Sequence, residues 1–351
     1  MDNIIFTDKK TERKTSIELL RIICMLMIVS SHAIIHGGFS EFPNSLNGVV
    51  SIFFTQGSRI GVNVFVILTG FFSVGHKTNF NKIKWQYLQV MSYSLVLSAS
   101  LLFIGEIQLE PKSIINAIFP ISTEQYWFAT SYLLLLLFSP CLQICVEKFT
   151  QLQYHFFLVV FGILWSVLPT LYIGNPGYNN FVWFVYVYMF AAYMRKYPLS
   201  FLSQVRIWHG IIMLICICAA ATVVYYFGRD IQFFKNNAIY MFSDMNKVPS
   251  IICAMLLFAG FKNCNIKQNK IVNRIAACTF GVYLLHDNPG IREFIWLKVF
   301  DNVKYIDQNY FILRLCSSIV IIFVIGILIE AMRKRVTTII MQCYCRIKKR
   351  N

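Results

Sequence analysis

Long apolar stretches, separated by short polar connections, run along most of the chain. A helix crosses the roughly 30 Å hydrocarbon core of a bilayer with about 20 predominantly apolar residues. Ten stretches approach or meet that length, and we expect membrane-spanning helices at Ile17–His36, Val49–Val74, Trp85–Gly105, Tyr126–Val146, His155–Ile173, Asn179–Met194, Trp208–Phe227, Val248–Phe261, Ile271–His286 and Phe311–Met332. The pattern therefore predicts an all-α fold, a polytopic integral membrane helix bundle of about ten transmembrane helices.

The connections between these stretches are short, so the sequence leaves no room for a second folded domain. We expect a cytoplasmic N-terminal tail over residues 1–16, one ten-span membrane domain over 17–332 and a basic cytoplasmic tail over 333–351. The second stretch is long enough to include an interfacial piece before Arg59, and the eighth is the shortest.

Composition supports this expectation. Hydrophobic residues make up 57% of the chain and charged residues 14%, against about 45–50% and about 25% in ordinary soluble domains. The mean hydropathy of +0.59 is positive. The excess of apolar residues excludes a soluble enzyme. Disorder is excluded as well, because a disordered chain needs low hydrophobicity.

The net charge of +16 would suggest nucleic acid in a soluble protein. Here most Lys and Arg fall in connections on one side of the predicted bundle, which is the bias that orients membrane proteins. We therefore expect both termini in the cytoplasm, a multi-pass protein of the cell (cytoplasmic) membrane, contact with membrane lipids and no nucleic-acid partner.

The first apolar stretch carries four ionisable side chains, which are costly inside a membrane and are therefore candidates for function. Arg21 and His32 are eleven positions apart (32 − 21). At about 100° and 1.5 Å per residue, they lie about 20° apart on one helix face and about 16 Å apart along the axis. Glu18 and His36 fall on the same side. Alternatively, Arg21 reaches lipid headgroups beside Glu18, and His32 is a neutral histidine bonded to a helix carbonyl.

Four segments in order resemble the membrane-bound acyltransferase family 3. They are Glu18-Leu19-Leu20-Arg21 with His32, the segment Gly61 to Phe72, Tyr126-Trp127-Phe128 leading to Pro140, and Thr279 to His286. The departures from the family pattern are Thr69, Val66, Lys82 and Lys84. The resemblance implies ten core spans and transfer of an acyl group, usually acetyl from acetyl-CoA, to hydroxyls of bacterial surface glycans.

The resemblance gives the candidate residues their roles. Transfer from a thioester to a hydroxyl needs a proton acceptor, and His32 is our candidate general base, with a transient acyl-histidine as the alternative. Arg21 suits the phosphates or the polarised carbonyl of the donor, with Glu18 orienting it. Lys82 and Lys84 are expected to bind the donor phosphates with Arg21. Acetyl-CoA is the expected co-substrate, and no metal is expected.

The acceptor, a glycan or lipid-linked glycan, is expected on the outer side. Trp127, Tyr283 and His286 are candidate substrate-binding residues there, although Trp127 also suits an interfacial aromatic belt. Arg59 could bind an anionic acceptor or pair with Glu124. A transporter or polymerase of lipid-linked glycans is the alternative function, and use of labelled acetyl donor separates it from the enzyme.

Overall fold

The computed structural model describes residues 14–108 and 110–348, and within these residues it contains helices and no strand. The α-helices are α1 (Thr15–Ile35), α2 (Leu46–Thr55), α3 (Gly57–Ser73), α4 (Phe80–Phe103), α5 (Pro111–Ile118), α6 (Trp127–Lys148), α7 (Gln151–Gly162), α8 (Leu168–Thr170), α9 (Asn180–Lys196), α10 (Ile207–Phe227), α11 (Gln232–Asn237), α12 (Val248–Asn263), α13 (Lys270–Ala276), α14 (Thr279–His286), α15 (Pro289–Glu293) and α16 (Phe311–Lys348). The expected N-terminal tail lies outside the described residues up to position 13.

Six helical segments in the described part of the chain are long and apolar enough to cross a membrane. They are Thr15–Ile35, Leu46–Ser73, Trp127–Lys148, Gln151–Thr170, Ile207–Phe227 and Phe311–Cys343. α4, α9, α12 and the α13–α14 pair occupy the other four positions at which the sequence predicts spans. The all-α membrane bundle is thus supported, while ten crossings with both ends in the cytoplasm stay a prediction.

The largest differences from the expected spans are two interruptions and one extension. The second stretch is divided at Gln56 into α2 and α3, and the ninth is divided after Ala276 into α13 and α14. Lys334 donates a hydrogen bond of 2.6 Å to the carbonyl of Ala277, which satisfies a carbonyl that the interruption would leave without an intrahelical partner. α16 continues past Met332 through Lys348, so the expected tail begins as a helix.

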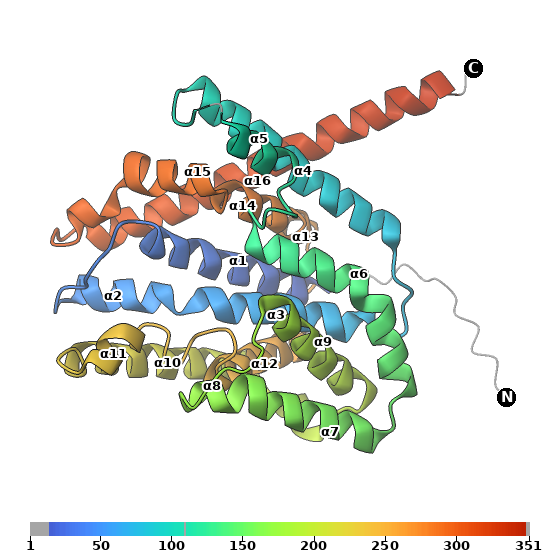
Figure 1. Cartoon of the computed structure of the whole chain (residues 1–351), viewed down its shortest axis with the longest axis vertical. Helices are drawn as coiled ribbons and strands as arrows, with labels where there is room; N and C mark the ends of the chain where they lie inside the picture. The colour runs from blue at the N-terminus through green and yellow to red at the C-terminus, as the bar shows by residue number, and fades with distance from the viewer. Residues whose placement is uncertain (1–13, 109, 349–351) are drawn as a thin grey trace.

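α1 occupies the middle of the bundle, with α2 and α3 on one side of it and α14 and α16 on the other (Figure 1). Its central residues Leu20, Cys24, Val29 and Ala33 are completely buried. A helix that is apolar around most of its circumference is typical of such a central position. Glu18 and His32 of α1 are therefore buried in the bundle.

One small residue and one polar residue of α3 determine how the neighbouring helices pack against it. A Cβ on Gly70 would lie 2.4 Å from the carbonyl oxygen of Tyr188, so only glycine allows α9 to pass here. The completely buried Asn63 donates to the carbonyl of Met245 (2.8 Å) and accepts from the indole N–H of Trp183 (2.9 Å). These contacts connect α3 to α9 and to the segment before α12.

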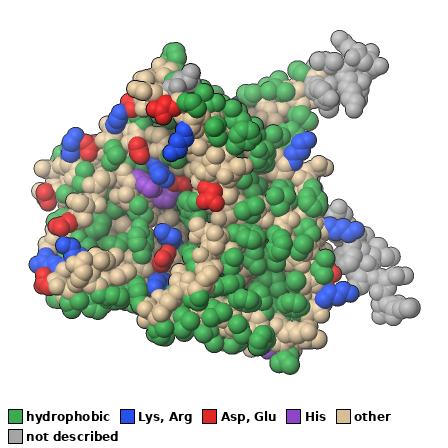
Figure 2. Space-filling view, viewed as in Figure 1, with side chains coloured by type: hydrophobic (Ala, Val, Ile, Leu, Met, Phe, Trp, Pro, Cys, Tyr) green, Lys and Arg blue, Asp and Glu red, His purple; other side chains and the backbone are tan. Residues whose placement is uncertain are grey.

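The kind of side chain on the surface changes from one end of the helices to the other. Figure 2 shows hydrophobic side chains gathered over the right-hand part of the visible face, with further Lys and Arg at its right edge, and mixed charges with a histidine patch on the left-hand part. The C-terminal end of α1 lies toward that charged part (Figure 1). We call this the outer end of the bundle, and the opposite end, where Lys14 and Lys262 lie, the inner end.

Candidate active site

Two histidines from opposite ends of the sequence meet at the outer end of the bundle. His32 lies in the last turn of α1, and His286 is the last residue of α14. Nδ1 of His32 lies 3.1 Å from Nε2 of His286, and the side chains are buried, with 7% and 0% of their surface exposed. The sequence placed His286 in the acceptor site, whereas the structure places it in direct contact with the candidate base.

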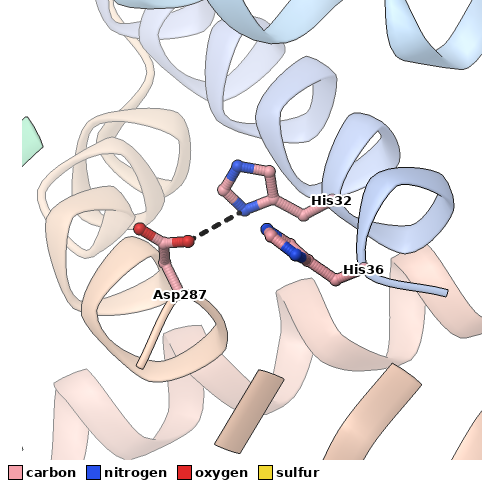
Figure 3. Close-up of side chains that lie close together, drawn as sticks. All are labelled: His32, His36 and Asp287. Carbon is pink, nitrogen blue, oxygen red and sulfur yellow. Dashed lines mark ion pairs between the residues drawn. The ribbon is translucent and has the colours of Figure 1, made fainter. Parts of the chain in front are cut away.

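Asp287 follows His286 directly and completes this cluster. Its Oδ1 lies 3.5 Å from Nδ1 of His32, as Figure 3 shows, and 3.7 Å from a terminal nitrogen of Arg292 in α15. His36 lies one turn after His32, and the two rings meet edge to face with centroids 5.1 Å apart. Asp287 is buried and His36 is partly exposed, so the cluster opens toward solvent beside His36.

Arg59 contributes positive charge to the same end of the bundle. Its guanidinium forms an ion pair of 3.2 Å with Asp244 and lies over the ring of Tyr240 at 5.3 Å. The pairing with Glu124 that the sequence suggested is therefore wrong. Both members of the observed pair have 37% of the side chain exposed. Arg59 thus stands near the candidate base with several N–H donors free of the ion pair.

Aromatic residues line the inward side of the histidine pair. The ring of Tyr283 lies edge to face with His286, with centroids 6.3 Å apart, and close to Tyr126. The hydroxyl of Tyr126 accepts a hydrogen bond from Asn288. The hydroxyl of Tyr283 lies beside the carboxylate of Asp287 and the backbone of Ala129. Trp127, at the start of α6, makes its ring contact with Phe128, at 6.1 Å.

The inner half of α1 carries Glu18 and Arg21, the two residues of this helix that were predicted to act on the donor. Glu18 is buried, with 5% exposed, and Arg21 is half-buried. Among the described residues no ion pair joins them, and Oε2 of Glu18 and Nε of Arg21 have no hydrogen-bond partner. The structure therefore places both side chains on α1 as expected but without the contact by which Glu18 was to orient Arg21. Both atoms are buried without the partner that a buried polar atom usually has.

Three basic residues gather at the inner end, two of them beside the ring of Phe71. Arg195 and Lys262 lie over this ring at 5.3 Å and 5.7 Å, and Lys14 donates to the backbone carbonyl of Lys262. Burial, followed by the charges of Lys14 and Arg195, lowers the pKa of Lys262. A concentration of like charge of this kind favours an anionic ligand. We call Lys14, Arg195 and Lys262 the inner basic cluster.

Lys82 and Lys84, which the sequence assigned to the donor, are exposed side chains in the first turn of α4. From the sequence, the inner basic cluster was interpreted only as part of the excess of Lys and Arg on the cytoplasmic side. Its members lie far apart in the sequence, so only their common position at the inner end of three predicted spans indicated that they meet. Asp287 and Arg292 were missed for a similar reason, because they stand just after a predicted span in what was taken as an outer connection.

His32, His36 and Asp287 could also be considered as metal ligands. Each offers one ligand atom, the three atoms lie within 4.8 Å of one another, and imidazole with carboxylate is a donor set that transition metals accept. However, Arg292 already contacts the carboxylate, and the positive charges of Arg59 and Arg292 act on His32. Nδ1 of His32 is also engaged by the hydrogen bond described above. We therefore interpret the cluster as a hydrogen-bonded group of ionisable side chains.

Comparison with known proteins gives one match. The family model of the acyltransferase domain matches residues 14–331, a range that includes all four segments on which the resemblance was based. No curated protein and no solved structure matches the chain significantly. The family predicted from the sequence is confirmed.

Proposed function

Because the chain belongs to acyltransferase family 3 and is a multi-pass membrane protein, we propose that it is an O-acetyltransferase of the cytoplasmic membrane. In this proposal it moves the acetyl group of cytoplasmic acetyl-CoA to a hydroxyl of a bacterial surface polysaccharide or its lipid-linked precursor. The observation that carries the proposal is the buried contact of His32 with His286, at the outer end of a continuous helix whose inner half carries Arg21.

His32 is the general base of the proposed reaction. The acceptor hydroxyl loses its proton to the imidazole while its oxygen forms a bond to the thioester carbon. The carbon–sulfur bond then breaks, and the proton passes to the departing sulfur of coenzyme A. Imidazole suits both steps because it accepts and returns a proton at cellular pH.

The donor is proposed to extend along α1. Its phosphates bind at the inner end, where the half-buried Arg21 and the inner basic cluster offer charge-assisted hydrogen bonds. The rise of α1 between Arg21 and His32 is about 16 Å, a length comparable with an extended pantetheine arm. The thioester can therefore reach the outer half of the bundle while the nucleotide stays at the inner end.

The acceptor is proposed to approach from the outer end. Arg59 and the hydroxyl of Tyr283 are polar groups proposed to orient it, and Trp127 is an aromatic surface on which a sugar ring can stack. Exposure of Arg59 allows it to contact a glycan without breaking the buried cluster.

Acetyl transfer in cells and with the purified chain tests the proposal. His32→Ala should abolish the O-acetyl signal in NMR spectra of the surface glycan, and it should stop release of coenzyme A from labelled acetyl-CoA by protein in nanodiscs. His76→Ala is the matched control, because His76 is exposed in the connection before α4. An unchanged O-acetyl signal in the membrane-inserted His32→Ala protein would overturn the assignment.

A further inference from the structure

The hydrogen bonds of His286 determine which of its nitrogens carries a proton. Its Nδ1 lies 2.6 Å from the carbonyl oxygen of Val282, four residues earlier in α14. A carbonyl oxygen can only accept, so Nδ1 must be the donor. His286 has no exposed surface, and a neutral ring is favoured where a charge would lose all hydration. Nε2 of His286 is then unprotonated and can only accept.

The same reasoning extends to His32. Its Nδ1 lies 3.1 Å from the unprotonated Nε2 of His286, so Nδ1 of His32 must be the donor of that hydrogen bond. In a neutral imidazole the other nitrogen then has the free lone pair. The chain of contacts from the Val282 carbonyl through His286 therefore leaves Nε2 of His32 as the basic atom.

The negative charge of Asp287 lies where it can stabilise His32 when that ring becomes positively charged. Its Oδ1 lies 3.5 Å from Nδ1 of His32, the side away from the free lone pair. A carboxylate beside the proton-bearing nitrogen stabilises the imidazolium that forms when the other nitrogen takes a proton. Arg292 forms an ion pair of 3.7 Å with the same oxygen.

Other charged and titratable groups face His32 as well. His36 follows the last residue of α1 and meets the His32 ring edge to face, and Arg59 in α3 and Arg292 in α15 bring positive charge to the same end of the bundle. These two cations oppose a positive charge on His32, whereas Asp287 favours it. The carboxylate is therefore the group that offsets them during proton transfer.

We propose that His286 and Asp287 are positioning residues, which hold His32 with its proton on Nδ1 so that Nε2 receives the proton of the acceptor hydroxyl. This inference rests on the proposed transferase function. In the proposed step the hydroxyl proton moves to Nε2, the carbon–oxygen bond forms, the carbon–sulfur bond breaks, and the proton on Nε2 passes to the thiolate of coenzyme A.

The tautomer can be measured without any assay of activity. In ¹⁵N NMR spectra of the histidine-labelled full chain, the His32 ring, assigned by its loss in His32→Gln, should show a protonated Nδ1 and an unprotonated Nε2 at a pH where it is neutral. In His286→Leu, which removes the acceptor, the population should shift toward the Nε2-protonated form. Protonation of Nε2 in the unaltered protein would overturn the proposal.

Kinetics of two variants at position 286 test the role in turnover. His286→Leu should lower kcat about 100-fold, in the range typical of general-base catalysis, with KM values for donor and acceptor changed less than about threefold. His286→Gln keeps an acceptor oxygen for Nδ1 of His32 and should recover at least about tenfold of the lost kcat. Equal losses in two variants of equal thermal stability would show a purely structural role.

Asp287→Asn completes the test. It keeps the size of the side chain but removes the charge, so kcat should fall while the His32 tautomer in the resting protein stays unchanged. An unchanged kcat would exclude Asp287 from the role. If the unaltered chain releases no coenzyme A from acetyl-CoA, the transferase assignment fails, whereas the tautomer measurement still tests the contacts of His286 and Asp287 with His32. If His32→Ala is fully active, only the general-base role of His32 fails.

Discussion

Gly281 of α14 faces the carboxylate of Glu330 on α16 so closely that a Cβ at position 281 would lie 2.7 Å from Oε2 of Glu330. The carboxylate cannot easily move away, because it accepts two hydrogen bonds of 2.8 Å from Arg333 and one of 3.0 Å from the hydroxyl of Tyr93. The absence of a side chain at Gly281 therefore allows α14, and with it His286, to pack against α16.

Gly281→Ala should consequently destabilise the protein by about 1–3 kcal/mol, the usual cost of overpacking a filled interior. Thermal or denaturant unfolding in detergent measures this loss. Gly174→Ala is the control, because the nearest atom to a Cβ at Gly174 is 4.0 Å away. Equal stability of the two variants would mean that the carboxylate of Glu330 can move aside.

Arg21→Lys should lose most of the acetyl-transfer activity while the protein remains in the membrane. Lysine keeps the positive charge but lacks the planar set of N–H donors that binds a phosphate or a carbonyl through two hydrogen bonds. The unpartnered Nε of Arg21 is one of the donors that lysine cannot replace. Full activity of Arg21→Lys in the coenzyme A release assay would leave Arg21 with a structural or lipid-binding role.

The sequence predicted the helical class and the positions of the long helices because apolar stretches of span length are a strong signal. It also placed Arg21 and His32 on one face of the first helix, and α1 is indeed one continuous helix over both residues. Helical periodicity within a single segment is enough for such a prediction.

What the sequence could not supply are contacts between segments. His32 meets Asp287 and His286 only because α14 packs against α1, and no local pattern reports this packing. Arg59 was given the wrong partner for the same reason. The interruption after Ala276 was also missed, since it contains neither proline nor glycine; a carbonyl there accepts from Lys334 of α16.

The inner basic cluster should determine the affinity for the donor. Arg195→Gln should raise the KM for acetyl-CoA about tenfold, equivalent to about 1.4 kcal/mol and within the usual contribution of a hydrogen bond to a charged group. The effect should shrink as salt is added, because screening weakens the remaining charges. Lys304→Gln, at an exposed position outside the cluster, serves as the control. Equal KM values in the two variants would place the donor elsewhere.

The lowered pKa of Lys262 predicts how this affinity depends on pH. Because its pKa lies below the ordinary value of 10.5, Lys262 loses its proton, and the cluster loses positive charge, earlier than an exposed lysine would as the pH rises. Binding of coenzyme A should therefore weaken in the alkaline range below pH 10.5. Lys262→Arg, whose side chain stays charged, should bind coenzyme A with less dependence on pH. Identical profiles in equilibrium binding to the two proteins would contradict this.

The ion pair between Arg59 and Asp244 should matter little for stability and more for the acceptor. Pairs this exposed contribute about 0.2–1 kcal/mol, so Arg59→Gln and Asp244→Asn should change the unfolding midpoint only slightly. If Arg59 orients the glycan, Arg59→Gln should raise the acceptor KM several-fold and leave the donor KM unchanged. Asp244→Asn frees the guanidinium and should not raise the acceptor KM. Equal changes in both variants, with a double variant no worse than either, would mean that only the ion pair is needed and that Arg59 does not contact the acceptor.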